Sequence, residues 1–247
     1  MREEISRWFN ALGLTRKRVL CIHGNIIFAY LFEPNHGNGR GIVYCHGGFG
    51  AITSAKKVWI RHMRHLGYVV LALQYPGEGL SPGKDKPEAT KDFQEVADSA
   101  SWLRERYGVS SIDLVGVSRG GWVALHSFAR SSAYFHSCFV SVAPTSLPEF
   151  FKETSLPTPV QLELKEYFGN RSPITHVREI AQTGKRIGLL YDKDDQIVPE
   201  NQGTMMHNAL GEEGGNVKSH VSEGYGHGMI LYPKNQKVLV KWLLERE

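Results

Sequence analysis

The stretch Ile112–Leu125, IDLVGVSRGGWVAL, connects two apolar runs through small residues, with Ser118 at the bend. Gly116, Ser118 and Gly120 match the pattern G-x-S-x-G. This pattern is typical of a nucleophile elbow, a sharp strand-to-helix turn that exposes a serine hydroxyl. Glycine suits both flanking positions because a side chain there would collide with neighbouring backbone. The stretch therefore predicts a strand that ends near Val117, a helix directly after the serine, and Ser118 as a nucleophile.

Short apolar runs alternate with helical patterns along the rest of the chain. Runs rich in β-branched residues, typical of buried parallel strands, lie at 41–47, 68–74, 111–117, 137–144 and 186–192. Helices are expected at 54–66, 87–107, 119–130, 200–210 and 234–245. Two earlier runs joined at Gly24-Asn25 predict an antiparallel hairpin. We therefore predict an α/β fold: a mostly parallel, doubly wound sheet with an N-terminal antiparallel hairpin and helices on both faces.

Length and composition favour one soluble domain, residues 1–247. The hydrophobic content is 41% and the charged content 22%, and no apolar run has the roughly 18 residues of a membrane span. The N-terminus lacks a secretory signal, and the three cysteines are an odd number in apolar runs, so free thiols in the cytoplasm are expected. A net charge of +4 is too weak to predict nucleic-acid binding. The sequence leaves the oligomeric state open.

The segment 145–185 is the one irregular stretch of the chain. It is rich in proline and polar residues and has one helical piece, around 161–168. We interpret it as a possible small cap or lid over the site.

A nucleophilic serine needs a base to take its proton and a carboxylate to orient that base. His227, in the loop SEGYGHGMI after a strand-like run, is the predicted base, because this fold uses the order Ser, Asp, His. The acid should follow the strand at 186–192, where YDKDDQIVP offers Asp192, Asp194 and Asp195. We favour Asp195, with Asp194 as the alternative.

Acyl transfer also needs donors for the oxyanion. One is expected to be the backbone N–H of Arg119, directly after the nucleophile, and the other the amide of Gly48 or Phe49 in the glycine-rich loop His46–Ala51. That loop lacks the third glycine of a dinucleotide-binding pattern, and no cysteine or carboxylate accompanies His62 and His65 at metal-ligand spacing. We therefore predict no cofactor and no metal.

With these motifs, the chain resembles the α/β-hydrolase superfamily, and specifically the catalytic domain of the prolyl oligopeptidase family. The resemblance extends from about residue 19 nearly to the end of the chain, and its most specific part is SPITHVREI…RIGLLYDKDDQIVP, 172–199. The family's D-x-x-V-P pattern points to Asp195 as the acid, its Gly-His-Gly matches 226–228, and its Ser-x-Gly-Gly turn matches 118–121. The loop QYPGEGLSPG, 74–83, looks like the superfamily's Tyr-Arg-Gly-x-Gly-x-Ser loop, with Pro76 in place of the arginine.

Two departures from that family shape the expected function. The large peptidases carry a β-propeller for which 247 residues leave no room, and some members use a tyrosine hydroxyl beside the oxyanion where this chain has His46. We therefore expect cleavage of a small-molecule acyl substrate, a carboxylic ester or thioester, with His46 and Trp122 as candidate substrate contacts. The Arg119 side chain is expected either to meet a substrate carboxylate or to lie along the surface. The alternatives are a peptidase or amidase of the prolyl oligopeptidase type, and a non-catalytic binding protein on the same scaffold.

Overall fold

The computed structural model of the protein describes residues 16–22, 25–48, 58–78, 81 and 89–245. Of the sequence-based predictions, Phe49, Gly24, the first four residues of the helix expected at 54–66 and the first two of that at 87–107 lie outside the described residues.

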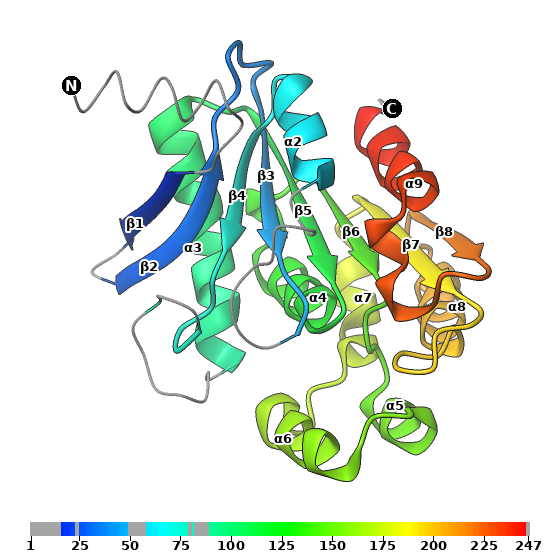
Figure 1. The fold of residues 1–247 in the computed structure, drawn as a ribbon. Helices are drawn as coiled ribbons and strands as arrows, with labels where there is room; N and C mark the ends of the chain where they lie inside the picture. Colours follow the sequence, from blue (N-terminus) through cyan, green and yellow to red (C-terminus); the bar gives the residue numbers. More distant parts are fainter. Residues whose placement is uncertain (1–15, 23–24, 49–57, 79–80, 82–88, 246–247) are drawn as a thin grey trace.

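One sheet runs through the molecule (Figure 1). In the described residues it has eight strands, in the order β1-β2-β4-β3-β5-β6-β7-β8. The strands are β1 (Arg16–Ile22), β2 (Asn25–Phe32), β3 (Arg40–Cys45), β4 (Val69–Leu73), β5 (Ser111–Val117), β6 (Ser137–Ser141), β7 (Arg186–Asp192) and β8 (Val217–Ser222). β1 pairs antiparallel with β2 and β2 with β4, while the strands from β4 to β8 are parallel. The predicted mostly parallel sheet with an N-terminal antiparallel hairpin is confirmed.

Helices cover both faces of this sheet (Figure 1). They are α2 (Val58–His65), α3 (Ala89–Tyr107), α4 (Arg119–Ser131), α5 (Leu147–Glu153), α6 (Thr158–Phe168), α7 (Val177–Ala181), α8 (Asn201–Glu212) and α9 (Pro233–Leu244). α2 and α9 contact each other on one face, and α3, α4, α7 and α8 form a row of contacts on the other. Short helices of the tighter 3-10 type lie at Ser132–Tyr134, Pro173–His176 and Gly226–Leu231.

The central strands are buried on both faces, which explains their continuous apolar sequence. Every residue of β4, β6 and β7 is buried, and in β5 only Ser111 is partly exposed. Because parallel strands end at the same edge, the segments that follow β3, β5 and β7 meet at one edge of the sheet, where such folds bind ligands. Helices α5 and α6 lie beyond that edge (Figure 1).

The strand expected at 137–144 is shorter than predicted, because the chain turns out of the sheet after Ser141. Val142 has a φ of 46°, a left-handed conformation that is strained for a β-branched residue. Its backbone N–H donates to the Leu190 carbonyl at 2.9 Å, while the Ser141 carbonyl accepts the N–H of Ser118 at 2.8 Å. The end of β6 is thus bent toward the serine, which apolar sequence alone does not reveal.

Two of the three cysteines, Cys45 and Cys138, are buried free thiols in the sheet. Within the described ranges, no helix is both long and apolar enough to cross a membrane.

Candidate active site

Ser118 lies in the turn between β5 and α4 and has a strained backbone, with φ 54° and ψ −125°. The backbone of the turn is packed so closely at its glycines that no side chain would fit there. A Cβ on Gly116 would meet the backbone of Gly120, and a Cβ on Gly120 would meet the Cys45 carbonyl at the end of β3. The sequence pattern therefore builds the predicted elbow, and α4 directs its N-terminus at the serine.

A chain of hydrogen bonds joins Ser118, His227 and Asp195. The Nε2 atom of His227 lies 2.9 Å from Ser118 Oγ, and its Nδ1 atom lies 2.8 Å from Asp195 Oδ2. Asp195 is 2% exposed. A carboxylate can only accept, so Nδ1 carries the proton and Nε2 is left to accept from the serine hydroxyl. The structure thus brings these three predicted residues together with the geometry of a serine–histidine–acid triad.

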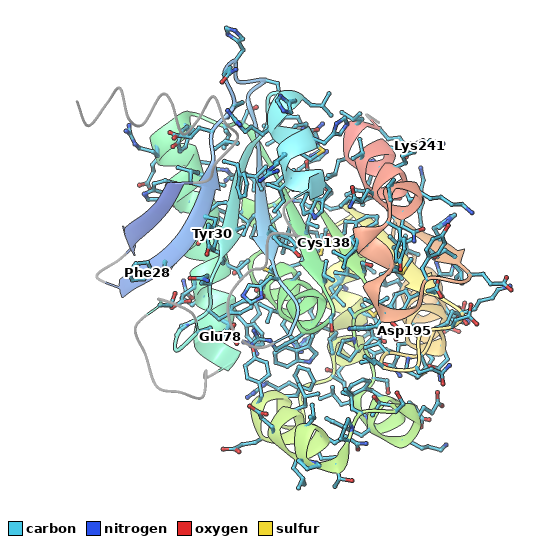
Figure 2. All side chains as sticks on the ribbon, in the orientation of Figure 1. Phe28, Tyr30, Glu78, Cys138, Asp195 and Lys241 are labelled. Atoms are coloured by element: carbon cyan, nitrogen blue, oxygen red, sulfur yellow. The ribbon has the colours of Figure 1, made fainter. Side chains whose placement is uncertain are left out.

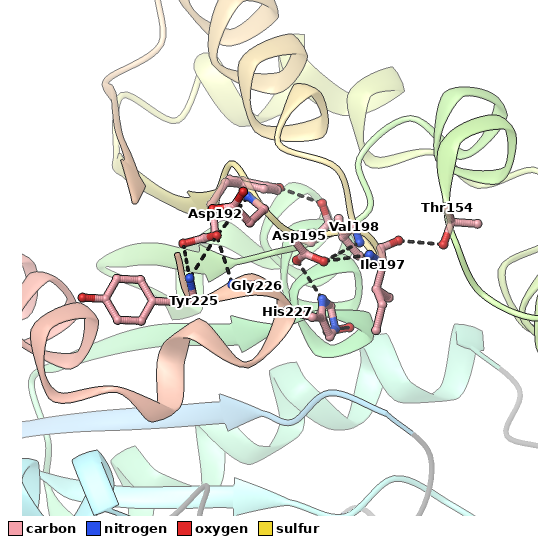
Figure 3. A network of polar contacts seen from close by, with 12 residues as sticks. Thr154, Asp192, Asp195, Ile197, Val198, Tyr225, Gly226 and His227 are labelled. Atoms are coloured by element: carbon pink, nitrogen blue, oxygen red, sulfur yellow. Dashed lines mark hydrogen bonds and ion pairs between the residues drawn. The ribbon is translucent and has the colours of Figure 1, made fainter. Parts of the chain in front are cut away.

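Asp192, the last residue of β7, and Asp194 and Asp195 in the loop after it have separate roles; Figure 3 labels Asp192 and Asp195. Asp195 Oδ1 accepts the backbone N–H groups of Ile197 and Val198, at 2.8 and 3.0 Å, and these bonds leave Oδ2 for the histidine. Asp194, the alternative acid, instead accepts the N–H of Gly224 at 2.7 Å. The choice of Asp195 over Asp194 therefore fits the geometry.

Asp192 secures the loop that carries the histidine. Its Oδ1 atom accepts the N–H groups of Asp194 and Gly226, each at 3.0 Å, and its Oδ2 accepts from Ser222 Oγ at 2.9 Å. Burial alone would raise its pKa, but these hydrogen bonds, with that of Tyr225, outweigh burial and hold the pKa of Asp192 below its usual 3.8. A charged Asp192 therefore holds the backbone next to His227.

The two predicted oxyanion segments lie side by side at the serine. A Cβ on Gly47 would lie only 2.7 Å from the Val117 carbonyl and 2.8 Å from the Ser118 Cβ, so the loop after β3 contacts the elbow directly. Gly48 has a φ of 71° and, like Arg119, lines the cavity at the serine. Arg119 is the first residue of α4, where backbone N–H groups have no acceptor within the helix.

An apolar cavity of about 340 Å³ opens beside Ser118 and His227. The segment 145–185, expected to form a cap, supplies much of its wall through Phe150 of α5 and through Leu164 and Phe168 of α6. The other apolar side chains on the wall are Tyr44, Val117, Pro144, Leu156, Val160, Ile197, Val198, Ile230 and Leu231.

The segment that forms this wall is anchored to the rest of the molecule. Thr154 Oγ1 donates to the Ile197 carbonyl at 2.7 Å (Figure 3), and Gln202 Oε1 accepts the N–H groups of Thr145 and Ser146 at 2.9 Å. The first bond connects the end of α5 to the loop of Asp195. The wall and the acid are therefore held in one hydrogen-bonded unit.

The structure does not bring His46 and Trp122, the predicted substrate contacts, to this cavity. Both side chains are buried, at 1% and 0% exposure, and neither is among the described residues that line the wall. Trp122 donates from Nε1 to the Arg171 carbonyl at 2.7 Å within an aromatic cluster. His46 packs on Tyr75 instead. A direct substrate contact by either residue has no support in this geometry.

The side chain of Arg119 follows neither expected course. It is 2% exposed, so it does not lie along the surface, and its Nη2 atom pairs with Glu78 of the protein itself at 2.6 Å. Sequence reasoning missed Glu78 and the wall residues of α5 and α6. Only the glycine-rich context PGEG, in a loop after a strand, could have drawn attention to Glu78.

The described residues gather no group of three or more histidine, cysteine, aspartate or glutamate side chains that could hold a metal ion. The polar groups at the serine are the side chains of the triad and the neighbouring backbone amides. The chemistry available to this donor set is nucleophilic attack with proton transfer.

The fold and this site define a serine hydrolase of the α/β-hydrolase class. The model of the prolyl oligopeptidase family matches residues 57–245, and the chain belongs to that family. A comparison with curated protein sequences gives no match.

Solved structures with the same fold include both peptidases and an esterase. The acylaminoacyl peptidase of Pyrococcus horikoshii has a TM-score of 0.77 at 16% identity, over 93% of this chain and 41% of that one. A puromycin-hydrolyzing peptidase of Mycobacterium tuberculosis has 0.72 at 19% identity, over 93% and 38%. An esterase of Pyrococcus furiosus has 0.74 at 17% identity, over 93% and 91%. The chain thus spans about two fifths of the length of either peptidase.

Proposed function

We propose that the protein hydrolyses a small carboxylic ester or thioester through an acyl-enzyme on Ser118. Ser118 Oγ attacks the acyl carbon as His227 Nε2 takes the hydroxyl proton. The bond from carbon to the leaving oxygen or sulfur then breaks, and His227 gives the proton to the departing alcohol or thiol. Water attacks the acyl-enzyme by the same route, and Ser118 regains its proton.

The other groups of the site have fixed roles in this proposal. Asp195 holds the histidine tautomer and stabilises the imidazolium that forms in each step. The backbone N–H groups of Arg119 and of Gly48 or Phe49 donate to the oxyanion. No step needs a cofactor or a metal ion.

The observation that carries the ester assignment is the character of the cavity. Its described wall includes no carboxylate side chain that would receive the amino group of a peptide or aminoacyl substrate, and the guanidinium of Arg119, one of the lining residues, is paired with Glu78. Apolar side chains dominate, and about 340 Å³ lies near the lower end of the roughly 300–1,000 Å³ typical of ligand pockets. A short apolar acyl group fits these properties.

The runner-up is a peptidase or amidase that uses the same three residues. Membership of the prolyl oligopeptidase family supports it, and the fold is shared with acylaminoacyl and puromycin-hydrolyzing peptidases. In that case the leaving group is an amine, which depends more than an alcohol on protonation by His227.

The deciding experiment compares 4-nitrophenyl esters of two to twelve carbons, matching acyl thioesters, and aminoacyl 4-nitroanilides. We expect the highest kcat/KM with a short or medium ester or thioester. Higher kcat/KM with the anilides would select the peptidase, and tight binding without turnover above that of Ser118→Ala would select a binding protein.

A pair of variants on α6 tests whether the cavity holds the acyl chain. Val160 lines the cavity, whereas Leu162 is 60% exposed on the same helix. Val160→Trp is expected to lower kcat/KM for the longest accepted esters by about 10-fold or more while sparing acetate, because one methylene already alters binding by about 1 kcal/mol. Leu162→Trp is the matched control and should leave the profile unchanged.

A further inference from the structure

Glu78 is a buried carboxylate that lies between the two segments expected to bind the oxyanion. It follows β4, is 5% exposed, and with Asp195 lies at the lower edge of the sheet in Figure 2. Its Oε1 atom is 2.6 Å from Arg119 Nη2, and its Oε2 atom is 3.4 Å from His46 Nε2. One carboxylate therefore faces side chains from two different loops.

Each of these partners belongs to a segment that holds a predicted oxyanion donor. Arg119 contributes its own backbone N–H and follows Ser118 directly, and His46 precedes the Gly47-Gly48 loop. The two segments are already in contact at Gly47. Glu78 joins them a second time, through side chains, behind the wall of the cavity.

Aromatic rings enclose the ion pair and fix its orientation. The Arg119 guanidinium lies 4.5 Å from the Tyr75 ring centre and 5.0 Å from that of Tyr167 on α6. The Tyr75 hydroxyl donates to the His46 carbonyl at 3.3 Å. We call the five residues His46, Tyr75, Glu78, Arg119 and Tyr167 the Glu78 network. Because the Glu78–Arg119 ion pair is buried away from water, its electrostatic attraction depends strongly on the distance between the two groups. The pair therefore permits little displacement of either oxyanion segment.

We propose that Glu78 is a positioning residue that sets the distance between the two oxyanion donors. It does not touch the substrate, and it acts through Arg119 and His46 on the backbone that does. Donors of this kind stabilise the transition state only when they sit about 3 Å from the place where the negative oxygen forms. Displacement by about 1 Å can lower a rate about 100-fold.

This inference rests on the proposed function, and its test separates a role in the oxyanion site from a role in folding alone. The test variant is Glu78→Gln, which keeps the size of the side chain and removes its charge. The readout is hydrolysis of an ester and of its thionoester, in which sulfur replaces the carbonyl oxygen. Because sulfur is a weak acceptor, donors placed for an oxyanion contribute little to the thionoester reaction.

The matched control is Asp113→Asn, at the opposite end of β5. Asp113 is also fully buried, and its Oδ2 atom pairs with Arg40 Nη2 at 2.8 Å. The same chemical change is therefore made in a second ion pair with a buried carboxylate, at the end of β5 away from the serine. Thermal unfolding of both variants reports the cost to the fold.

We expect Glu78→Gln to lower kcat for the ester about 10- to 100-fold with little change in KM, and to lower kcat for the thionoester less than about threefold. Asp113→Asn should lower the unfolding temperature while leaving the ratio of the two rates unchanged. An unchanged ratio in Glu78→Gln, whether both rates fall together or neither falls, would overturn the proposal.

A second variant keeps the test decisive if Glu78→Gln does not fold. His46→Gln leaves the Arg119–Glu78 pair in place and should move the ratio in the same direction by about threefold to 10-fold. No change in the ratio for that variant would count against the proposal in the same way. If the native protein hydrolyses no ester at all, the proposed function fails, which is a different result.

Discussion

Two regions centred on carboxylates hold the site, and they differ in what the carboxylates bind. At the end of β7 and in the loop after it, Asp192 and Asp195 accept mainly backbone N–H groups. In the Glu78 network, the carboxylate faces the side chains of Arg119 and His46, which come from separate loops. The first arrangement shapes one local turn and the segment beside it, whereas the second joins parts of the chain that are distant in sequence.

This difference decides what a substitution does. A carboxylate bound by backbone amides holds the loop through its acceptor oxygens, so a substitution lowers stability only to the extent that it weakens those hydrogen bonds. When a carboxylate that pairs with a buried guanidinium is removed, the guanidinium keeps a buried charge without its partner. The fold loses stability, and the side chains that the carboxylate held together are no longer fixed. Four aspartate-to-asparagine substitutions around the site measure how much each carboxylate contributes, from the largest expected effect to the smallest.

The largest effect is expected from Asp195→Asn. The amide still accepts from Ile197 and Val198, but its NH₂ group faces His227 Nδ1 and favours the wrong tautomer. We expect kcat to fall by about 10³- to 10⁴-fold with little change in the unfolding temperature. Steady-state kinetics and calorimetry on the same preparation check this, and a fall of less than 10-fold would assign the acid elsewhere.

Asp192→Asn should affect the fold more than the chemistry. It weakens charge-assisted hydrogen bonds to Asp194 and Gly226 and lowers the free energy of unfolding by about 2–4 kcal/mol near neutral pH. Because the pKa of Asp192 is below 3.8 in the folded state, its contribution is present above that pH and is lost as pH falls further. Urea unfolding of both proteins at pH 7 and pH 3 checks the sign: the difference must shrink in acid.

Asp92 lies beside the Glu78 network and should make the free energy of unfolding depend on pH in the opposite direction. Burial raises its pKa from 3.8 to about 6, although a hydrogen bond from Tyr167 and the charge of Arg119 oppose the shift. Between these values the folded protein keeps a proton that the unfolded chain releases, so stability falls as pH rises through that window. Between pH 4 and pH 7, the free energy of unfolding should decrease by about 1–3 kcal/mol less in Asp92→Asn than in the native protein. Parallel slopes for the two proteins in urea unfolding would contradict the prediction.

The smallest effect is expected from Asp194→Asn. Its carboxylate is exposed and accepts one N–H, that of Gly224, so water replaces the lost contact. We expect less than about 1 kcal/mol in stability and less than about threefold in kcat. A kcat loss as large as that of Asp195→Asn would show that the two neighbours share the role of the acid.

The same comparison explains what the sequence could predict. The elbow and the place of Asp195 beside His227 could be predicted because each lies in a tight turn that glycines or aspartates mark within a few residues. His227 followed from the order Ser, Asp, His along the chain. The strands were predicted well wherever both faces are buried, but the end of β6 was not, because its bend at Val142 depends on the partner strand.

The rest of the site depends on contacts that no local pattern encodes. Glu78 and Arg119 are 41 residues apart, and nothing near either one shows that they pair. His46 is expected to touch substrate because it stands where some family members have a tyrosine, and Trp122 because it lies beside the elbow. Tertiary packing instead directs both side chains into the interior. The helices of segment 145–185 supply much of the cavity wall. Their lining residues have the spacing of an ordinary amphipathic helix, so the sequence does not show that they face a cavity.

The most direct test of the account is to label the protein with a fluorophosphonate and to locate the adduct by peptide mass spectrometry. We expect one adduct, on Ser118, that forms quickly in the native protein, slowly in His227→Ala and not at all in Ser118→Ala. A folded protein that stays unlabelled, or that carries its adduct on another residue, would contradict the assignment of Ser118 as the nucleophile.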